Sequence, residues 1–330
     1  MNSTFSDKYY LAPSPDGADM TAAIEEKLNG EGACLLGVGT YFVKEVNMPV
    51  GTSLMGMGAG TKLVLLPEVQ KGYTVKLNSF CTIRDMSILG NEELQPKPCE
   101  VGERHGIAFI GTATHENNKG QPRNAIISGC QINSFSGSGI FCLNTGYHTT
   151  ASITASDCHI VGCGVGINIH HHSEYHEFTN MLCSTNLYGC INNGGNNVFV
   201  NCGFNSNTTG FVIDNSRGQS LNDSHGSMVG CTINHTNANK GIGLLLLGVK
   251  CGYVFSGGQI FYSKVVCENC TGVHITGFNF GRNTEFEIRG GEPVVLSDSI
   301  FAAAPSITVE DGGKLIVRGC YDRKGEAIEA

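Results

Sequence analysis

The chain has 330 residues and a formal net charge of −8, from 21 Lys and Arg against 29 Asp and Glu. No basic cluster stands out against this acidic balance, so the sequence gives no reason to expect nucleic-acid binding. No run of 18 apolar residues occurs, so a membrane-spanning helix is not expected either. Glycine is abundant at 45 residues, Pro numbers only 9 and Trp is absent, a composition that suits many strands joined by tight turns.

The first segment, residues 1–38, is predicted to hold a short capping helix. Its first ten residues, MNSTFSDKYY, have neither the basic nor the apolar region of a secretory signal. This predicts a cytoplasmic protein or one assembled into a phage particle. Asp19 is suited to N-cap a helix over 19–28, and Gly30 is suited to end it.

A short phrase then returns about ten times: an apolar residue, two small or polar residues, usually a Cys, Met or Gly, and another apolar residue. Clear copies are ISGCQI, VNCGF, VGCTI and VRGCY. Named by their fourth position, the copies lie at Met86, Cys130, Cys158, Met181, Cys202, Cys231, Gly258, Phe278, Ser299 and Cys320. Most spacings are 20 to 29 residues, and the first is about twice that. Such a period is typical of a solenoid.

A second phrase follows each copy and consists of a strand-length apolar run, often opened by Gly. These runs lie at 106–110, 139–143, 164–169, 210–214 and 241–247, with later equivalents at 265–269, 286–290 and 307–311. No segment beyond residue 30 keeps a helical period. The sequence therefore predicts an all-β fold, a single-stranded right-handed parallel β-helix of about ten coils, with residues 39–330 forming one domain.

The segment 15–65, PDGADMTAAIEEKLNGEGACLLGVGTYFVKEVNMPVGTSLMGMGAGTKLVL, resembles the entry segment of the pectate-lyase-like right-handed β-helix superfamily. The likeness lies in an Asp-Gly, a short helix, a Gly-Thr-Tyr strand and a Gly-x-Gly turn. It implies the fold and an association with carbohydrate, since the superfamily includes polysaccharide lyases, polygalacturonase-like hydrolases, inulin fructotransferases and phage tailspikes. RHGIAFIG at 104–111 is similar to the fructotransferases. The hydrolase signatures and the calcium-binding lyase pattern are not found, and fold alone does not select a function.

Five of the fifteen cysteines share the fourth position of the first phrase. We expect them to stack inside the coils as free thiols, because Cys behaves as a small buried hydrophobe. A disulfide framework is the alternative, but it suits small domains with too little core. Cys267 and Cys270 have a metal-ligand spacing without a second such pair, so no metal site and no cofactor is predicted.

The turns after the second strand of successive coils are expected to leave at one corner. They hold 111–124, 144–152, 170–177, 193–196 and 214–225, and they concentrate His and carboxylate side chains. Loops on a rigid scaffold often carry function. A cleavage site for glycosidic bonds needs two carboxylates, and Glu174 and Asp214 leave two coils apart, or roughly 10 Å. Asp223 is a competing partner, although NDSHG alternatively forms an Asx turn.

Other side chains at this corner are candidates for contact with a sugar polymer. They are Arg217, His225, His172, His176, Tyr175 and His148. For the run HHHSEYH, three interpretations remain open: substrate contact, a metal site and an inert hydrated loop.

Three functions follow from these residues. The first is an enzyme that cleaves or rearranges glycosidic bonds of a poly- or oligosaccharide in a groove along the coils, by carboxylate acid–base catalysis. The second is a non-enzymatic glycan-binding module of the phage-tail or adhesin kind, and the third is a calcium-dependent polysaccharide lyase. A homo-oligomer, a trimer, is also expected from an apolar face over 284–312, made by Phe286, Ile288, Val294, Val295, Phe301 and the run at 302–305.

Overall fold

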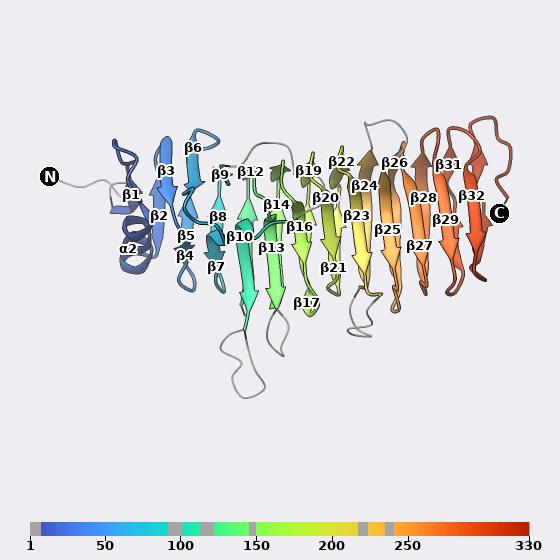
Figure 1. Ribbon diagram of the computed structural model, residues 1–330, viewed down its shortest axis with the longest axis horizontal. Coiled ribbons are helices and arrows are strands. Elements are labelled where there is room, and N and C mark those ends of the chain that lie inside the picture. Colours follow the sequence, from blue (N-terminus) through green and yellow to red (C-terminus); the bar gives the residue numbers. More distant parts are fainter. Residues whose placement is uncertain are drawn as a thin grey trace. The chain divides into compact units, whose positions relative to one another are not determined.

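The computed structural model describes residues 8–91, 101–112, 122–144, 150–216, 224–234 and 241–329. The chain divides into two compact units, residues 1–168 and 169–330. We describe the architecture unit by unit (Figure 1), and the domain boundary expected at 38/39 stays a prediction. Within the described residues, no helix is long and apolar enough to cross a membrane.

The first unit consists of one helix and short strands. Their bounds are β1 (Tyr10–Leu11), α2 (Thr21–Glu31), β2 (Ala33–Leu36), β3 (Gly39–Val43), β4 (Val46–Asn47), β5 (Ser53–Met55), β6 (Thr61–Leu65), β7 (Gly72–Leu77), β8 (Thr82–Arg84), β9 (Ser87–Leu89), β10 (Arg104–Gly111), β11 (Arg123–Ser128), β12 (Gln131–Asn133), β13 (Ser138–Asn144), β14 (Thr150–Ser156), β15 (His159–Val161) and β16 (Val165–Ile169), the last of which reaches residue 169 of the second unit. The strands pair in parallel in three columns, β2-β5-β8-β11-β14, β3-β6-β9-β12-β15 and β4-β7-β10-β13.

The second unit repeats this arrangement. Its strands are β17 (Ser173–Glu174), β18 (Glu177–Thr179), β19 (Leu182–Ser184), β20 (Tyr188–Asn192), β21 (Asn197–Val200), β22 (Gly203–Asn205), β23 (Thr209–Asp214), β24 (Gly226–Asn234), β25 (Ile242–Leu247), β26 (Tyr253–Phe261), β27 (Lys264–Glu268), β28 (Val273–Phe280), β29 (Glu285–Arg289), β30 (Val294–Ser297), β31 (Ile300–Phe301), β32 (Ser306–Glu310), β33 (Leu315–Arg318) and β34 (Tyr321–Asp322). One of its three columns runs β20-β23-β25-β27-β29-β32. The strands β24, β26 and β28 are long, and each of them takes part in both of the other two columns. Because each coil adds one rung to every column, both units are parallel β-helices, and the predicted fold class is confirmed.

The first repeated phrase has a backbone cause. The residue before each fourth position is Asp, Asn or Gly, and its φ lies between 52° and 68°. These residues are Asp85, Gly129, Asp157, Asn180, Asn201, Gly230, Gly257, Gly277, Asp298 and Gly319. Asn, Asp and Gly are the residues that tolerate this left-handed conformation. The kink turns the next side chain inward, and Cys130, Cys202 and Cys231 are at most 1% exposed.

The expected stack of free thiols is also found. None of the fourteen described cysteines forms a disulfide, and all but Cys251 are buried. The backbone N–H of Cys202 donates to the sulfur of Cys231 across 3.3 Å. Gly in the second phrase has a packing cause: a Cβ on Gly139 would lie 2.3 Å from Ile160 Cγ2, so no side chain fits there.

The spacing between Met86 and Cys130 is about twice the usual one because a single coil with long connections lies between them. Ile83 pairs with Ile127, and Ile88 pairs with Ile132, so the strands on either side of the gap are direct neighbours. The additional residues lie between β9 and β10 and between β10 and β11.

The capping helix differs in its ends from the prediction. The helix α2 spans Thr21–Glu31, and Asp19 Oδ1 accepts the N–H of Thr21 at 3.0 Å. Gly32, not Gly30, ends the helix, because Gly32 has φ 75° and donates its N–H to the carbonyl of Leu28. Helix α2 packs on β2 and β4, where it covers the first coil of the unit with Ile24 and Leu28.

Candidate functional site

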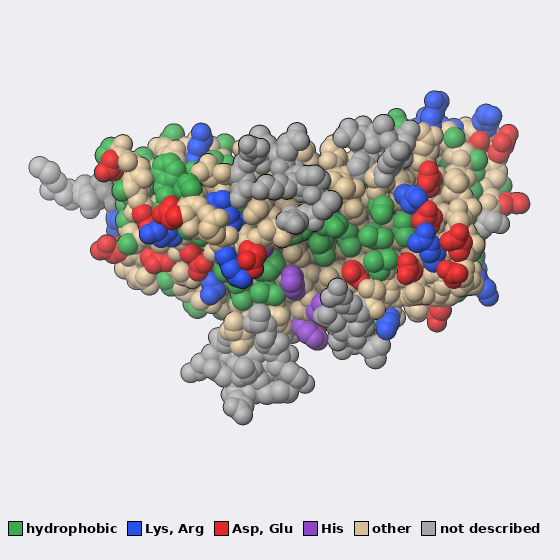
Figure 2. Space-filling model, viewed as in Figure 1, with side chains coloured by type: hydrophobic (Ala, Val, Ile, Leu, Met, Phe, Trp, Pro, Cys, Tyr) green, Lys and Arg blue, Asp and Glu red, His purple; other side chains and the backbone are tan. Residues whose placement is uncertain are grey.

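The corner predicted to gather the site is present in the second unit. Residue Asn193 of the turn 193–196, after β20, donates its N–H to the carbonyl of Ile169, at the end of β16. Further along, Asn215 after β23 donates its N–H to the carbonyl of Leu247 at 2.8 Å. Turns that are distant in sequence are therefore stacked along one edge of the β20-to-β32 column. Figure 2 shows imidazole side chains gathered near the lower edge of the visible face, at the place where Figure 1 labels β17.

Glu174 ends the short strand β17 and is half-buried. Its Oε2 accepts a hydrogen bond from Nδ2 of Asn196 at 3.4 Å. The next residue, Tyr175, is 55% exposed and has a left-handed backbone with φ 58°. Its N–H donates to the carbonyl of Gly195 at 3.2 Å. The exposed ring beside a carboxylate can stack on the apolar face of a sugar.

Asp214 ends β23, two rungs further along. Its N–H donates to Oδ1 of Asn193 at 2.8 Å. Its own Oδ1 accepts the N–H of Ser216 at 3.0 Å and the Ser216 hydroxyl at 2.5 Å. This is an Asx turn, which fixes the carboxylate relative to the backbone.

The turn 193–196 is the centre of the site, and the sequence interpretation passed it over as a short connection. Asn196 contacts Glu174, Gly195 accepts from Tyr175, and Asn193 accepts from Asp214. Gly194 accepts the N–H of Ser224 at 3.0 Å, so the end of the loop after β23 also rests on this turn. The cluster of turn residues NNGGNN was the available signal.

His225 lies beside this turn and is half-buried. Among the described residues its Nδ1 atom is buried without a hydrogen-bond partner. The rest of the half-buried imidazole keeps some surface open at this turn. His225 thus remains a candidate for substrate contact.

The prediction that His176 contacts a substrate is corrected, because its side chain faces the interior. It is 0% exposed and shares a 2.9 Å hydrogen bond between its Nε2 and the Ser173 hydroxyl. Burial lowers the pKa of its imidazole to about 3. An imidazole sealed in this way is not available to a substrate, so its role is structural.

A chain of buried polar groups extends from His176 below the corner. The His176 N–H donates to Oδ1 of Asn197, and Nδ2 of Asn197 donates to Oδ1 of Asn192, both at 2.9 Å. Nδ2 of Asn192 in turn donates to the Tyr253 hydroxyl at 3.4 Å. Satisfied networks of this kind hold a backbone in one arrangement. Here the network supports the turns that carry Glu174 and Asp214.

The remaining histidines of the run differ in exposure. His172 is exposed with φ 56°, and it stays a candidate for substrate contact. Burial, and then the neighbouring His171, lower the pKa of His170. Among the described residues, no three His, Cys, Asp or Glu side chains are placed to hold a metal ion.

Three predicted site residues, Asp223, Arg217 and His148, lie outside the described residues, as do most of 111–124 and 144–152. The apolar face expected over 284–312 is only partly a surface. Phe286, Ile288, Val294 and Phe301 are each at most 2% exposed and belong to the core. Val295 and the run 302–305 keep part of their surface exposed, so the trimer stays a prediction.

Columns of parallel strands define each unit of this protein as a parallel β-helix. No protein-family model matches the chain, and no curated protein matches it in sequence. Solved structures with the same fold were found, however, and those named below share little sequence with the chain.

DFA-IIIase from Arthrobacter chlorophenolicus A6, solved in complex with GF2, is similar with a TM-score of 0.59 at 8% identity, over 97% of this chain and 93% of that one. The A-module of the Azotobacter vinelandii mannuronan C-5 epimerase AlgE4 gives 0.57 at 14% identity, over 95% and 96%. A mutant tailspike protein of Escherichia coli bacteriophage HK620, in complex with a pentasaccharide, gives 0.57 at 11% identity, over 97% and 64%.

The chain therefore spans nearly the whole length of the two enzymes but less than two thirds of this tailspike. It spans 45% of the enzymatically active domain of a second phage tailspike. At these identities the likeness establishes the fold alone.

Proposed function

We propose that this protein is a carbohydrate-active enzyme that cleaves or rearranges glycosidic bonds of a poly- or oligosaccharide at the corner of the second unit. The observation that carries the proposal is the shared turn 193–196. Its Asn196 amide contacts the Glu174 carboxylate, and its Asn193 side chain accepts the N–H of Asp214. Two carboxylate-bearing residues are thus joined to one rigid element.

The chemistry requires one carboxyl group that gives a proton and one that takes a proton. Rungs of a parallel sheet are about 4.8 Å apart, so two rungs separate the backbones of Glu174 and Asp214 by roughly 10 Å. This is compatible with the roughly 6.5–9.5 Å between the carboxyl groups of inverting glycosidases once the side chains lean inward. We assign Glu174 as the acid that protonates the leaving glycosidic oxygen. Asp214, already an acceptor from Ser216, takes a proton from the water that attacks the anomeric carbon.

Three neighbouring side chains would bind the sugar. Tyr175 offers an exposed ring for stacking, His172 is exposed, and His225 is half-buried beside the same turn. These residues contribute to binding rather than to the proton transfers.

The proposal is tested with Glu174→Gln and Asp214→Asn on a panel of glycans scored for product. Each variant should lose about 10²–10⁴-fold in turnover. Both side chains are near the surface, so thermal stability should stay unchanged. Full activity in both variants would refute the assignment. An unsaturated product that absorbs in the ultraviolet, and is lost with a chelator, would instead identify a calcium-dependent lyase.

A second candidate is a glycan-binding module of a phage tail, with the phage particle as its location. The observation that favours it is the similarity to a tailspike solved with a pentasaccharide. Binding of a glycan without product on prolonged incubation would support this function over catalysis. A trimer would suit either function, and the mass of the protein in solution tests it.

A further inference from the structure

A hollow lies at the edge of the β20-to-β32 column opposite to the Glu174 corner. It has a volume of about 400 Å³ and is lined by Asn283, Thr284, Glu285, Ala303, Ala304 and Ser306. These residues come from the connections that enter β29 and β32. The turn 193–196 follows the carboxyl end of β20, whereas the hollow precedes the amino ends of β29 and β32. A ligand in the hollow is thus separate from the Glu174 corner.

One wall of the hollow is a carboxylate fixed by ion pairs. Lys264 Nζ lies 3.5 Å from Glu285 Oε2 and 2.6 Å from Glu287 Oε1. Lys264 lies on the preceding rung, and its ammonium group fixes the position of the Glu285 carboxylate. The Glu285 side chain remains 48% exposed and can accept further hydrogen bonds.

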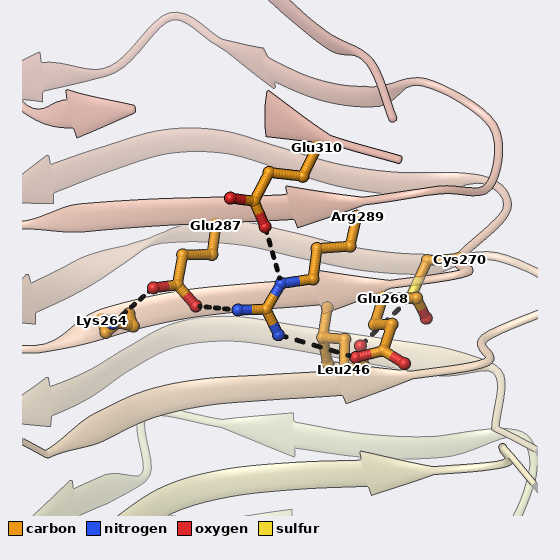
Figure 3. A network of polar contacts seen from close by, with 7 residues as sticks. All are labelled: Leu246, Lys264, Glu268, Cys270, Glu287, Arg289 and Glu310. Atoms are coloured by element: carbon orange, nitrogen blue, oxygen red, sulfur yellow. Dashed lines mark hydrogen bonds and ion pairs between the residues drawn. The ribbon is translucent and has the colours of Figure 1, made fainter. Parts of the chain in front are cut away.

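The same ion pairs continue across the outer face of the sheet (Figure 3). The Arg289 guanidinium lies 3.1 Å from a Glu287 oxygen, 3.4 Å from Glu310 and 3.8 Å from Glu268. Four carboxylates, Glu268, Glu285, Glu287 and Glu310, therefore surround two cations, Lys264 and Arg289. In Figure 2, acidic and basic side chains alternate over β27, β29 and β32. This acidic surplus disfavours an anionic ligand at the adjoining hollow.

The other wall combines small apolar groups with polar ones. Ala303 and Ala304 contribute small apolar side chains to the lining, and Asn283 supplies an amide at an exposed turn with φ 59°. The Thr284 hydroxyl is committed to the carbonyl of Gly281 at 3.0 Å, which fixes the floor.

An exposed aromatic ring stands one coil away. Tyr262 is 46% exposed, and its backbone is left-handed with φ 53°. Gly281 lies against the ring of Phe261, so Tyr262 is next to the turn 282–283 that borders the hollow. For a bulky residue this conformation is unusual, and such residues are often found at binding sites.

We propose that this hollow binds a neutral sugar unit of the glycan on which the Glu174 corner acts, and so serves as a second carbohydrate-binding site. Glu285 accepts hydrogen bonds from adjacent sugar hydroxyls, and Asn283 and Ser306 donate and accept others. The alanine methyl groups contact the apolar face of the ring, and Tyr262 stacks on a following unit. The volume is in the range of ligand pockets, roughly 300–1,000 Å³, and suits about one or two sugar rings. The inference rests on the proposed function.

The test observes the alanine methyl groups by nuclear magnetic resonance in the Glu174→Gln variant, which keeps catalysis from consuming the ligand. The probes are maltohexaose, mannohexaose, inulin-type fructo-oligosaccharides and, as an anionic probe, oligomannuronate. At least one neutral probe should shift the signals of Ala303 and Ala304 saturably, with a millimolar Kd, and oligomannuronate should not. Glu285→Ala should weaken this binding by at least about tenfold, that is by about 1.4 kcal/mol.

Glu310→Gln is the matched control, because Glu310 belongs to the same ion-pair network but does not line the hollow. It should leave the Kd unchanged. Absence of any shift with the neutral probes, a stronger response to oligomannuronate, or undiminished binding by Glu285→Ala would each overturn the proposal. The result is distinct from that of the proposed function, because methyl shifts with no product from the wild type would leave the hollow a binding site while refuting catalysis at Glu174.

Discussion

The N–H of Asp214 donates to Oδ1 of Asn193 across 2.8 Å, from one rung of the second unit to the turn of the preceding rung. Because Asn196 of the same turn donates to Glu174, the geometry between the two carboxylate-bearing residues is set by four consecutive residues. Displacing this turn would move both carboxylates relative to each other.

Asn193→Ala should therefore impair the reaction without unfolding the protein. The substitution removes the acceptor for the Asp214 N–H, a part-buried hydrogen bond worth about 1 kcal/mol. We expect kcat/KM to fall by about five- to tenfold through kcat. Steady-state kinetics on the glycan that is turned over measures it, with Asn29→Ala on the exposed face of α2 as the control. Unchanged kcat in a folded Asn193→Ala protein would show that this contact does not position Asp214.

Gly194→Ala should destabilise the second unit. A Cβ at this position would lie 1.9 Å from the carbonyl oxygen of Ser173, and backbone cannot give way cheaply. We expect a loss of at least about 2 kcal/mol in the free energy of unfolding, measured by urea denaturation. Gly30→Ala is the matched control, because Gly30 is in α2 with nothing within 4 Å. It should stabilise by about 0.5–1 kcal/mol. Equal effects of the two substitutions would contradict the packing of turn 193–196.

His176 should make the stability of the protein depend on pH. Its pKa is about 3 in the folded state because of burial, against about 6.5 in an unfolded chain. Since the unfolded chain binds the additional proton, the contribution is complete above about pH 6.5 and is lost as the pH falls towards 3. The difference between these two pKa values corresponds to about 5 kcal/mol.

Two measurements check this prediction. The imidazole signals of His176 should stay constant between about pH 8 and pH 4, and the free energy of unfolding should decline over the acidic part of that range. An imidazole that titrates near pH 6.5 would mean that His176 is reached by solvent.

Cys251 should be alkylated faster than the other described cysteines. Cys251 is exposed, whereas burial raises the pKa of Cys34 and of Cys163 to about 12. Thiolate is the reactive form, so the buried thiols should resist iodoacetamide in the native protein. Peptide mapping by mass spectrometry, in a Cys99→Ser background because that residue lies outside the described ones, should find Cys251 modified first. Rapid native modification of Cys202 or Cys231 would contradict the internal stack.

Much of the fold was predictable because it depends on local patterns. The spacing of Cys130 and Cys158, or of Cys202 and Cys231, reports the length of a coil directly, and the Asp, Asn or Gly before each such residue marks a left-handed corner. The ends of α2 were placed wrongly, since Gly30 and Gly32 are equally plausible stops when read from sequence. Packing of Leu28 inside the first coil lets the helix continue to Glu31.

The site was less predictable, and the run HHHSEYHE shows why. Tyr175 is exposed and His176 is sealed inside, although the two are neighbours in one polar segment. Left-handed backbone at His172 and Tyr175 reverses the expected alternation of side chains. The sequence alone determined that coils repeat, and that acids and imidazoles collect on successive turns. The tertiary structure decided which of them meet, because contacts between rungs depend on register, and register joins Asn193 and Asn196 to residues about twenty positions away.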